Sequence, residues 1–236
     1  MRALVLAGGA GSRLRPITHT QAKQLIPVAN VPILFHVLGQ IRDAGIEDVG
    51  IVTGTTGAEV RAAVGDGSAW GLRVTYIPQA EPLGIAHAVL TAEDFVRGEP
   101  FLLFLGDNLL LEGVSRFVRG FEANAPDAQI LLTRVDEPEH FGVAVVEGER
   151  VVRLVEKPKE FVSDIALVGV YLFRDSVLDA CRTLTPAASS RCPLCDCARC
   201  ACCRSWPVCS VLPARTCSPL RPTDRPRSFP ITARTA

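Results

Sequence analysis

Glycine and polar residues gather in four short clusters within the first half of the chain, and each could contact a phosphorylated ligand. The first is Gly8-Gly9-Ala10-Gly11-Ser12-Arg13, whose glycines would let backbone N–H groups approach a phosphate closely. Its spacing matches neither the Walker pattern nor the GxGxxG dinucleotide pattern. Taken alone, the cluster is equally typical of a simple turn after a strand.

The second and third clusters would supply cations and an amide. Lys23 opens the segment Lys-Gln-Leu-Ile-Pro-Val, which is otherwise apolar, and with Arg13 it could counter phosphate charge. The alternative is a solvated loop whose charges have no role. Gln79 opens the segment Gln-Ala-Glu-Pro-Leu-Gly, and its amide offers the donor and the acceptor that suit the edge of a nucleotide base. Proline and glycine predict a turn there equally well.

The fourth cluster places a carboxylate directly after an apolar run. Asp107 and Asn108 follow Phe101–Leu105 with only Gly106 between. An acid in this position suits Mg²⁺, which takes oxygen ligands. Aspartate and asparagine also cap helices well, so a helix N-cap is the alternative interpretation.

The elements predicted around these clusters alternate between strand and helix up to about residue 135. Short apolar runs indicate strands, and apolar residues at helical spacing indicate helices. The predicted strands are 3–7, 49–53, 72–77, 101–105 and 129–135, and the predicted helices are 31–44, 58–64, 85–96 and 114–124. This order predicts an α/β fold: an open, mostly parallel Rossmann-like sheet flanked by helices. In such sheets ligands bind beyond the carboxyl ends of the strands, where all four clusters lie.

The alternation of strands and helices ends near Phe141. Residues 142–146 and 150–155 flank a Glu-Gly-Glu turn and predict a β-hairpin, before a strand at 167–173 and a helix at 176–184. We therefore expect an antiparallel addition at the edge of the sheet, within one domain that covers residues 1–186.

The composition excludes some classes of function and also divides the chain. Lys+Arg and Asp+Glu number 25 each, so there is no charge excess to attract nucleic acid or anionic lipid. No apolar run has the length of a membrane span, and we expect a cytoplasmic protein. However, eight of the nine cysteines lie at or after Cys192, and all 19 glycines precede it. The average composition therefore describes neither part of the chain.

Several segments, taken together and in order, resemble the signature of the sugar-1-phosphate nucleotidylyltransferases, in particular the branch of deoxysugar pathways that uses thymidine nucleotides. The resemblance covers about residues 1–186 and rests on Leu6–Thr18, Lys23–Pro32, Gln79–Ala88, Leu105–Asn108, Phe141–Val143 and Glu156–Pro158. It implies attack of glucose 1-phosphate on the α-phosphorus of dTTP, which gives dTDP-glucose and pyrophosphate. UTP, CTP or GTP could replace dTTP, and a non-catalytic nucleotide-binding remnant is the alternative outside the enzyme class.

The resemblance also implies roles for individual residues. The histidines fit none of these roles, and we interpret His19, His36, His87 and His140 as structural or surface residues. The catalytic set would be Arg13, Lys23 and Asp107, with Asp107 holding Mg²⁺; the nucleotide would be bound by Gly8, Gly9, Gly11, Ser12, Gln24, Gln79 and Gly84; and the sugar phosphate by Gly142, Glu156, Lys157, Val168 and Tyr171.

The segment 187–236 departs from the family pattern. Three interpretations are a zinc or disulfide module, a disordered linker, and a tail translated out of frame. The segment has no histidines and no glycines, which counts against a zinc or disulfide module. The third is favoured because one choice of codons for Ala188–Pro193, read with a two-base offset, gives the Gly-Glu-Leu-Glu-Met-Pro that the family carries here. We expect an irregular, disordered tail, loss of a second metal-binding aspartate with little or no turnover, and possible oligomers whose interface is incomplete.

Overall fold

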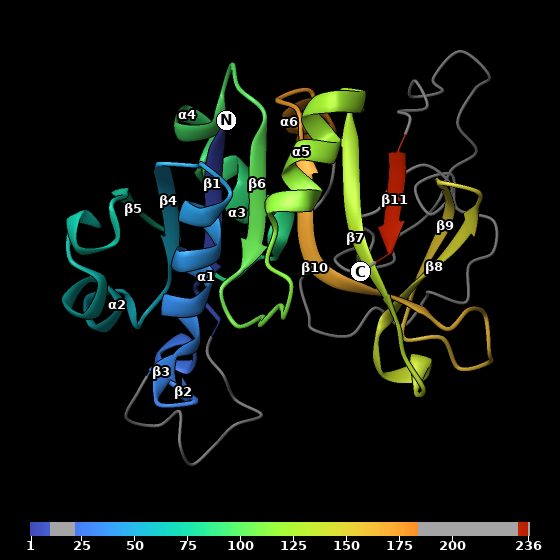
Figure 1. Ribbon diagram of the computed structural model, residues 1–236, viewed down its shortest axis with the longest axis horizontal. Coiled ribbons are helices and arrows are strands. Elements are labelled where there is room, and N and C mark those ends of the chain that lie inside the picture. Colours follow the sequence, from blue (N-terminus) through green and yellow to red (C-terminus); the bar gives the residue numbers. More distant parts are fainter. Residues whose placement is uncertain (10–21, 184–230, 236) are drawn as a thin grey trace.

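The computed structural model describes residues 1–9, 22–183 and 231–235, and its centre is one twisted mixed sheet (Figure 1). Within these residues the sheet has nine strands in the order β5-β4-β1-β6-β10-β7-β11-β9-β8, beside a separate two-stranded ribbon of β2 and β3. The strands are β1 (Arg2–Ala7), β2 (Pro27–Val28), β3 (Val31–Pro32), β4 (Asp48–Thr53), β5 (Arg73–Pro78), β6 (Phe101–Leu105), β7 (Ala128–Arg134), β8 (Gly142–Glu147), β9 (Arg150–Glu156), β10 (Ile165–Phe173) and β11 (Ile231–Thr235).

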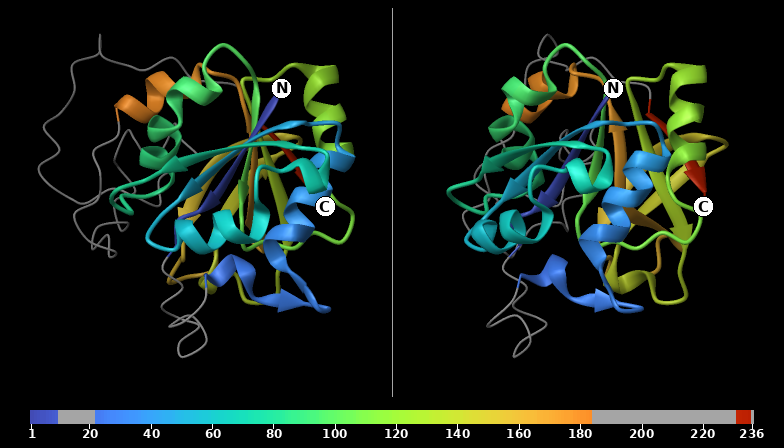
Figure 2. Two further views of the ribbon diagram at one scale, coloured as in Figure 1. Left: turned by 90° about the vertical axis from the view of Figure 1, so that its left-hand side faces the viewer. Right: turned by 60° about the vertical axis from the view of Figure 1, so that its left-hand side comes forward.

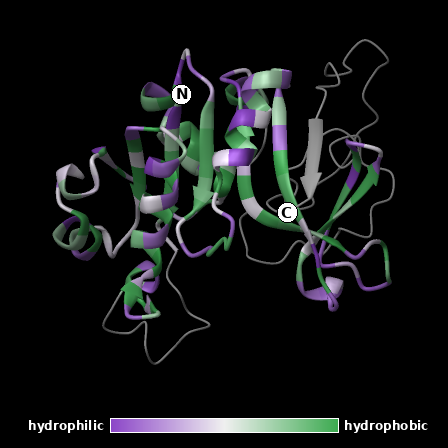
Figure 3. Cartoon of the chain, viewed as in Figure 1, coloured by the Kyte–Doolittle hydropathy of each residue, from purple (hydrophilic) through white to green (hydrophobic). Residues whose placement is uncertain are grey.

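The first half of the sheet is parallel, as its sequence predicts. β1 pairs in parallel with β4 on one side and with β6 on the other, and β4 pairs in parallel with β5. The apolar character of β6 is plain in Figure 3. Phe101–Phe104 of β6 are fully buried, because helices cover both faces of a parallel sheet.

Two layers of helices enclose the sheet, and each seals its own apolar cluster (Figures 1 and 2). α1, α2 and α5 bury residues such as Leu38, Val60 and Phe121 on one face. α3, α4 and α6 bury residues such as Val89 and Leu178 on the other. The helices are α1 (Ile33–Asp43), α2 (Gly57–Val64), α3 (Ile85–Thr91), α4 (Glu93–Val96), α5 (Ser115–Asn124) and α6 (Val177–Arg182), with 3₁₀ turns at Lys23–Leu25, Ser68–Trp70 and Pro138–His140.

The second half of the sheet carries the antiparallel addition. β10 runs antiparallel between β6 and β7, so β7 regains the direction of the parallel half. The β8–β9 hairpin is antiparallel and touches β10 through the pair Ala166–Val143. These pairings confirm the predicted fold class, a mostly parallel sheet with antiparallel strands added.

Two local expectations need correction. The predicted helix 85–96 is divided at Ala92, where the Thr91 hydroxyl donates to the His87 carbonyl at 2.8 Å, a back-bond that bends helices. Ile231–Thr235 forms β11 in parallel with β7, although the tail was expected to be irregular. β11 lies between β7 and β9 in the sheet, where strand pairing depends chiefly on backbone groups and β-branched residues are favoured. The rest of the tail, with its eight cysteines, lies outside the described residues.

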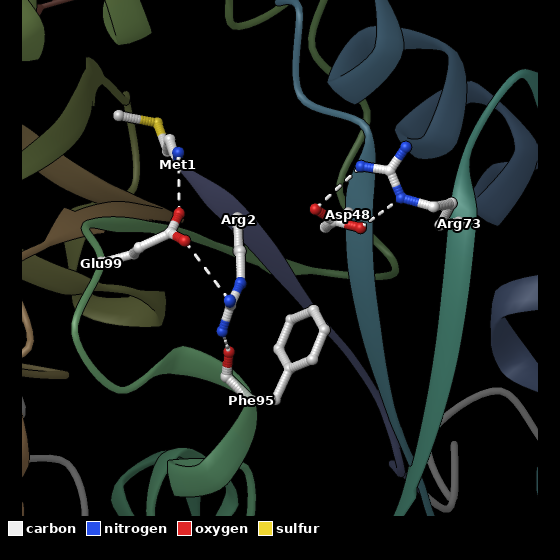
Figure 4. Close-up of polar contacts among 6 residues, drawn as sticks. All are labelled: Met1, Arg2, Asp48, Arg73, Phe95 and Glu99. Carbon is white, nitrogen blue, oxygen red and sulfur yellow. Dashed lines mark hydrogen bonds and ion pairs between the residues drawn. The ribbon is translucent and has the colours of Figure 1, made fainter.

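Polar contacts tie the strands together at the end of the sheet opposite the four clusters (Figure 4). Arg73 of β5 binds Asp48 of β4 through two hydrogen bonds of 2.7 and 3.0 Å. The Glu99 carboxylate forms ion pairs with the Met1 amino group at 3.1 Å and with Arg2 at 3.3 Å. The Arg73 guanidinium is the main reason that the pKa of Asp48 lies below its ordinary value. In the part of the chain that is described, no helix has the length and apolarity needed to cross a membrane.

Candidate functional site

The glycine loop after β1 lies against the loop after β4. A Cβ on Gly54 would come within 2.6 Å of the Gly8 carbonyl oxygen, and one on Gly8 would lie 3.3 Å from the Gly54 nitrogen. Only hydrogen fits at Gly54, so the two loops approach with bare backbone. Gly8 and Gly9 therefore stand at the carboxyl ends of the strands as expected. Gly54 was not among the residues predicted for the site, although its place directly after the predicted strand 49–53 was a signal for it.

Gln79 reaches the same place from β5. Its backbone N–H extends the β4–β5 pairing by donating to the Thr53 carbonyl at 2.8 Å. Its side-chain Nε2 lies 2.7 Å from His87 Nδ1, and its Oε1 lies 3.5 Å from the position that a Cβ on Gly8 would take. His87, expected to be structural or at the surface, thus contacts a predicted base-reading residue.

Lys23, the first residue of a 3₁₀ turn, forms an ion pair with Asp107, which lies in the loop after β6. Each side chain is about 30% exposed or less. The N-cap alternative for Asp107 and Asn108 is wrong, because the next helix, α5, begins only at Ser115. A turn after β6 holds them instead, and the Asn108 side-chain amide donates to the Val168 carbonyl of β10.

Gln24 is buried beside this ion pair, with 2% of its surface exposed. Its side chain lies close to Gly106, where a Cβ would meet Gln24 Cγ at 3.4 Å, and its Nε2 is 4.0 Å from a Cβ on Gly9. Its Oε1 has no hydrogen-bond partner within the described structure. A buried acceptor without a partner is costly, so Gln24 is a group that a ligand N–H or O–H would satisfy.

A cavity of about 460 Å³ lies beside the loop that follows β6 and is lined by residues of α3, β10 and the β8–β9 hairpin. All five residues predicted to bind the sugar phosphate line it, although they come from three strands and the residue after one of them: Gly142, Glu156, Lys157, Val168 and Tyr171. Asn108, adjacent to Asp107, lines the same cavity and joins it to the ion pair. His140 lines it too, a position that the sequence did not indicate.

A bulge in β10 allows Val168 and Tyr171 to share this cavity. Residues three apart on a regular strand face opposite sides, but the pairing with β7 shifts between Leu167 and Tyr171. Gly169 occupies the bulge at φ +83°, and a Cβ there would meet Leu105 at 2.5 Å and the Asn108 amide at 2.8 Å. The bulge therefore packs directly against the loop that carries Asp107.

Two charged residues that line the cavity, Glu156 and Lys157, lie at the end of β9. Glu156 Oε2 lies 2.8 Å from the position of a Cβ on Gly142, so a side chain at Gly142 would displace the carboxylate. Lys157 follows at φ +44°, a strained conformation for a residue with a side chain, and its N–H donates to the Phe141 carbonyl at 2.9 Å. Burial, and secondarily the Glu156 charge, raise the pKa of Tyr171 to about 12, so its hydroxyl stays a donor at neutral pH.

The remaining predicted residues are placed less completely. Gly84, at φ +99°, precedes α3, whose first residues Ile85 and Ala86 line the cavity. The described residues contain no group of three or more His, Cys, Asp or Glu side chains that could hold a metal ion. Gly11, Ser12 and Arg13 lie outside the described residues, as does His19.

The mixed sheet and the helices on its two faces form the Rossmann-like fold of the nucleotidyltransferases. The chain belongs to the nucleotidyl transferase family, whose model matches residues 2–212. It is similar to glucose-1-phosphate thymidylyltransferase from Streptomyces griseus, at 56% identity over 79% of this chain and 53% of that protein. The enzyme of the same name from Streptomyces antibioticus is 52% identical over the same shares.

A solved structure supports the same relationship. A candidate glucose-1-phosphate thymidylyltransferase from Bacillus anthracis, in complex with sucrose, superposes with a TM-score of 0.76 at 36% identity, over 80% of this chain and 77% of that one. The chain spans about half the length of the Streptomyces relatives, 53% of each.

Proposed function

We propose that this chain binds dTTP and α-D-glucose 1-phosphate and can join them to dTDP-glucose with release of pyrophosphate. The observation that carries the proposal is the cavity itself. It gathers Gly142, Glu156, Lys157, Val168 and Tyr171 and adjoins the Lys23–Asp107 pair. Two anionic substrates that repel each other need such a site, with a cation between them and donors that fix the sugar.

In the proposed reaction the protein supplies position and charge rather than a nucleophile. A phosphate oxygen of the sugar phosphate attacks the α-phosphorus in line, the bond to the leaving pyrophosphate breaks, and no enzyme intermediate forms. Lys23 draws the two phosphates together, and Arg13 counters charge on the pyrophosphate. Glu156 accepts hydrogen bonds from sugar hydroxyls, while Lys157 binds the sugar phosphate.

Asp107 would hold the Mg²⁺ that accompanies the nucleotide. The residues fit this ion, because Mg²⁺ keeps several waters and often takes one or two carboxylates plus substrate phosphates. When bound, the ion would neutralise developing charge on the phosphate oxygens. Lys23 pairs with the Asp107 carboxylate. Nucleotide phosphates give Lys23 a second anionic partner.

Glucose 1-phosphate titration tests the sugar-phosphate half of the proposal. Calorimetry in the presence of dTTP and Mg²⁺ should show saturable binding, weakened about tenfold or more by Glu156→Ala because hydrogen bonds to a charged group are lost. Glu149→Ala, in the exposed hairpin turn, should leave the affinity unchanged, and dTTP affinity should change little in either variant. Equal weakening by both variants would count against the proposed site.

The base is proposed to be thymine, with UTP, CTP and GTP as alternatives because phosphate contacts serve all of them. Competition of each nucleotide against bound dTTP decides between these. We also propose that residues 187–236 are translated out of frame, that the protein acts in the cytoplasm where nucleotides and sugar phosphates are made, and that any oligomer uses an incomplete interface.

A further inference from the structure

The side-chain amide of Gln79 is held in one orientation by a residue with no assigned role. Its backbone is fixed to β4 through the Thr53 carbonyl at 2.8 Å, and its Nε2 lies 2.7 Å from His87 Nδ1. An amide nitrogen only donates hydrogen bonds. With the amide in this orientation, Nδ1 is the acceptor and carries no proton, and the ring proton is on Nε2.

The orientation of the amide decides which group faces the glycine loop. Because Nε2 is engaged with His87, the opposite end of the planar amide, Oε1, is directed at the backbone of Gly8, 3.5 Å from the position of a Cβ there. The site thus offers a hydrogen-bond acceptor, rather than a donor, where a base would lie.

We propose that His87 is a positioning residue for base selection. By accepting from Gln79 Nε2, it keeps Oε1 as an acceptor for a ring N–H, which thymine and uracil carry at N3. Cytosine has an acceptor at N3, so the lone pair on its N3 would face a lone pair on Oε1 and no hydrogen bond would form. The inference rests on the proposed function, in which Gln79 reads the base.

The local fold explains how His87 reaches Gln79. The two residues are eight apart, on either side of a turn that ends at Gly84 with φ +99°. That glycine starts α3 (Ile85–Thr91), and His87 falls in its first turn. Neither side chain is fully buried, so the hydrogen bond, rather than core packing, is what restricts the amide.

Equilibrium binding of dTTP and dCTP to the full chain tests this assignment without requiring turnover. The wild type should prefer dTTP. His87→Leu removes the acceptor and frees the amide to rotate, so the preference should fall about tenfold, the effect of about one hydrogen bond. His87→Asn can accept through Oδ1 and should retain most of the preference, a rescue that loss of packing would not produce.

Gln79→Ala separates the inference from the function on which it rests. If Gln79→Ala abolishes the preference and His87→Leu leaves it unchanged, the role of His87 is overturned while base reading by Gln79 stands. If Gln79→Ala leaves the preference unchanged, or the wild type has none, both are overturned.

Nitrogen-15 NMR of the histidine rings in the wild-type chain gives a second readout that needs no variant. His87 Nδ1 should show the chemical shift of an unprotonated ring nitrogen and Nε2 that of a protonated one. A proton on Nδ1 would overturn the proposal, because the ring would then donate to Gln79 and the amide would turn the other way.

Discussion

Gly169 has no side chain, and this allows the bulge of β10 to pack closely against Leu105 and Asn108. The residue sits at φ +83° in the bulge of β10, and a Cβ would strike Leu105 and Asn108. Since Asn108 also donates to Val168, the bulge fixes the loop of Asp107 relative to the cavity.

Gly169→Ala should therefore destabilise the protein by about 2–4 kcal/mol, from a strained backbone and overpacking together. Gly148→Ala is the matched control, because Gly148 also has positive φ, +61°, but faces open space. It should cost about 1 kcal/mol. Urea unfolding of both variants measures the difference, and equal costs would show that the contacts with Leu105 and Asn108 have no weight.

Asp107 makes a second prediction at this scale. Asp107→Asn should reduce the Mg²⁺-dependent part of dTTP affinity by about tenfold, because a neutral amide is a weaker ligand for a hard cation. Asp164→Asn, which breaks the exposed ion pair with Arg134, should have no effect. Titrations with dTTP at high and negligible Mg²⁺ separate the two contributions; a Mg²⁺ dependence that survives Asp107→Asn would remove Asp107 from the metal site.

At the scale of elements, β10 and α6 carry two buried ionisable groups whose neutral forms the fold favours. Burial raises the pKa of Cys181 to about 11 and that of Tyr171 to about 12. In the unfolded chain these groups lose their protons near their ordinary values of about 9 and 10. The folded state then binds more protons than the unfolded state, so stability is present below pH 9 and is lost as pH rises.

Cys181→Ala should reduce the loss of unfolding free energy that occurs as the pH rises. Between pH 9 and 11 the thiol contributes up to about 1.4 kcal/mol per pH unit to the fall in unfolding free energy. Urea midpoints at pH 8 and pH 10.5 measure it. The wild type should lose more stability over this interval than the variant, and identical losses would mean that the thiol is not protected by the fold.

Elements whose contacts are local could be predicted from the sequence, whereas those set by distant partners could not. Phe101–Leu105 is continuously apolar, and its strand was predicted with the bounds that the structure has. Insertion of β10 between β6 and β7 depends on pairing with strands about 40 to 70 residues earlier, which no local pattern encodes. At the site, residue types identified Lys23, Asp107 and Gln79, but the contact of Gln79 with His87 needed the turn at Gly84.

For the whole molecule, the chain matches 53% of the Streptomyces griseus relative, and that match covers 79% of the chain itself. The proposal that residues 187–236 are out of frame is tested by the gene. Sequencing across codons 185–195 should reveal the Gly-Glu-Leu-Glu reading at a two-base offset. A frame that encodes no such segment would contradict the proposal.

The most direct test of the account is pyrophosphate release by the purified chain with dTTP, glucose 1-phosphate and Mg²⁺, measured beside the Streptomyces griseus enzyme. We expect saturable binding of both substrates with dTDP-glucose formed at least a hundredfold more slowly, roughly what loss of one charged ligand costs. A rate comparable to that of the relative, or no binding of either substrate, would contradict it.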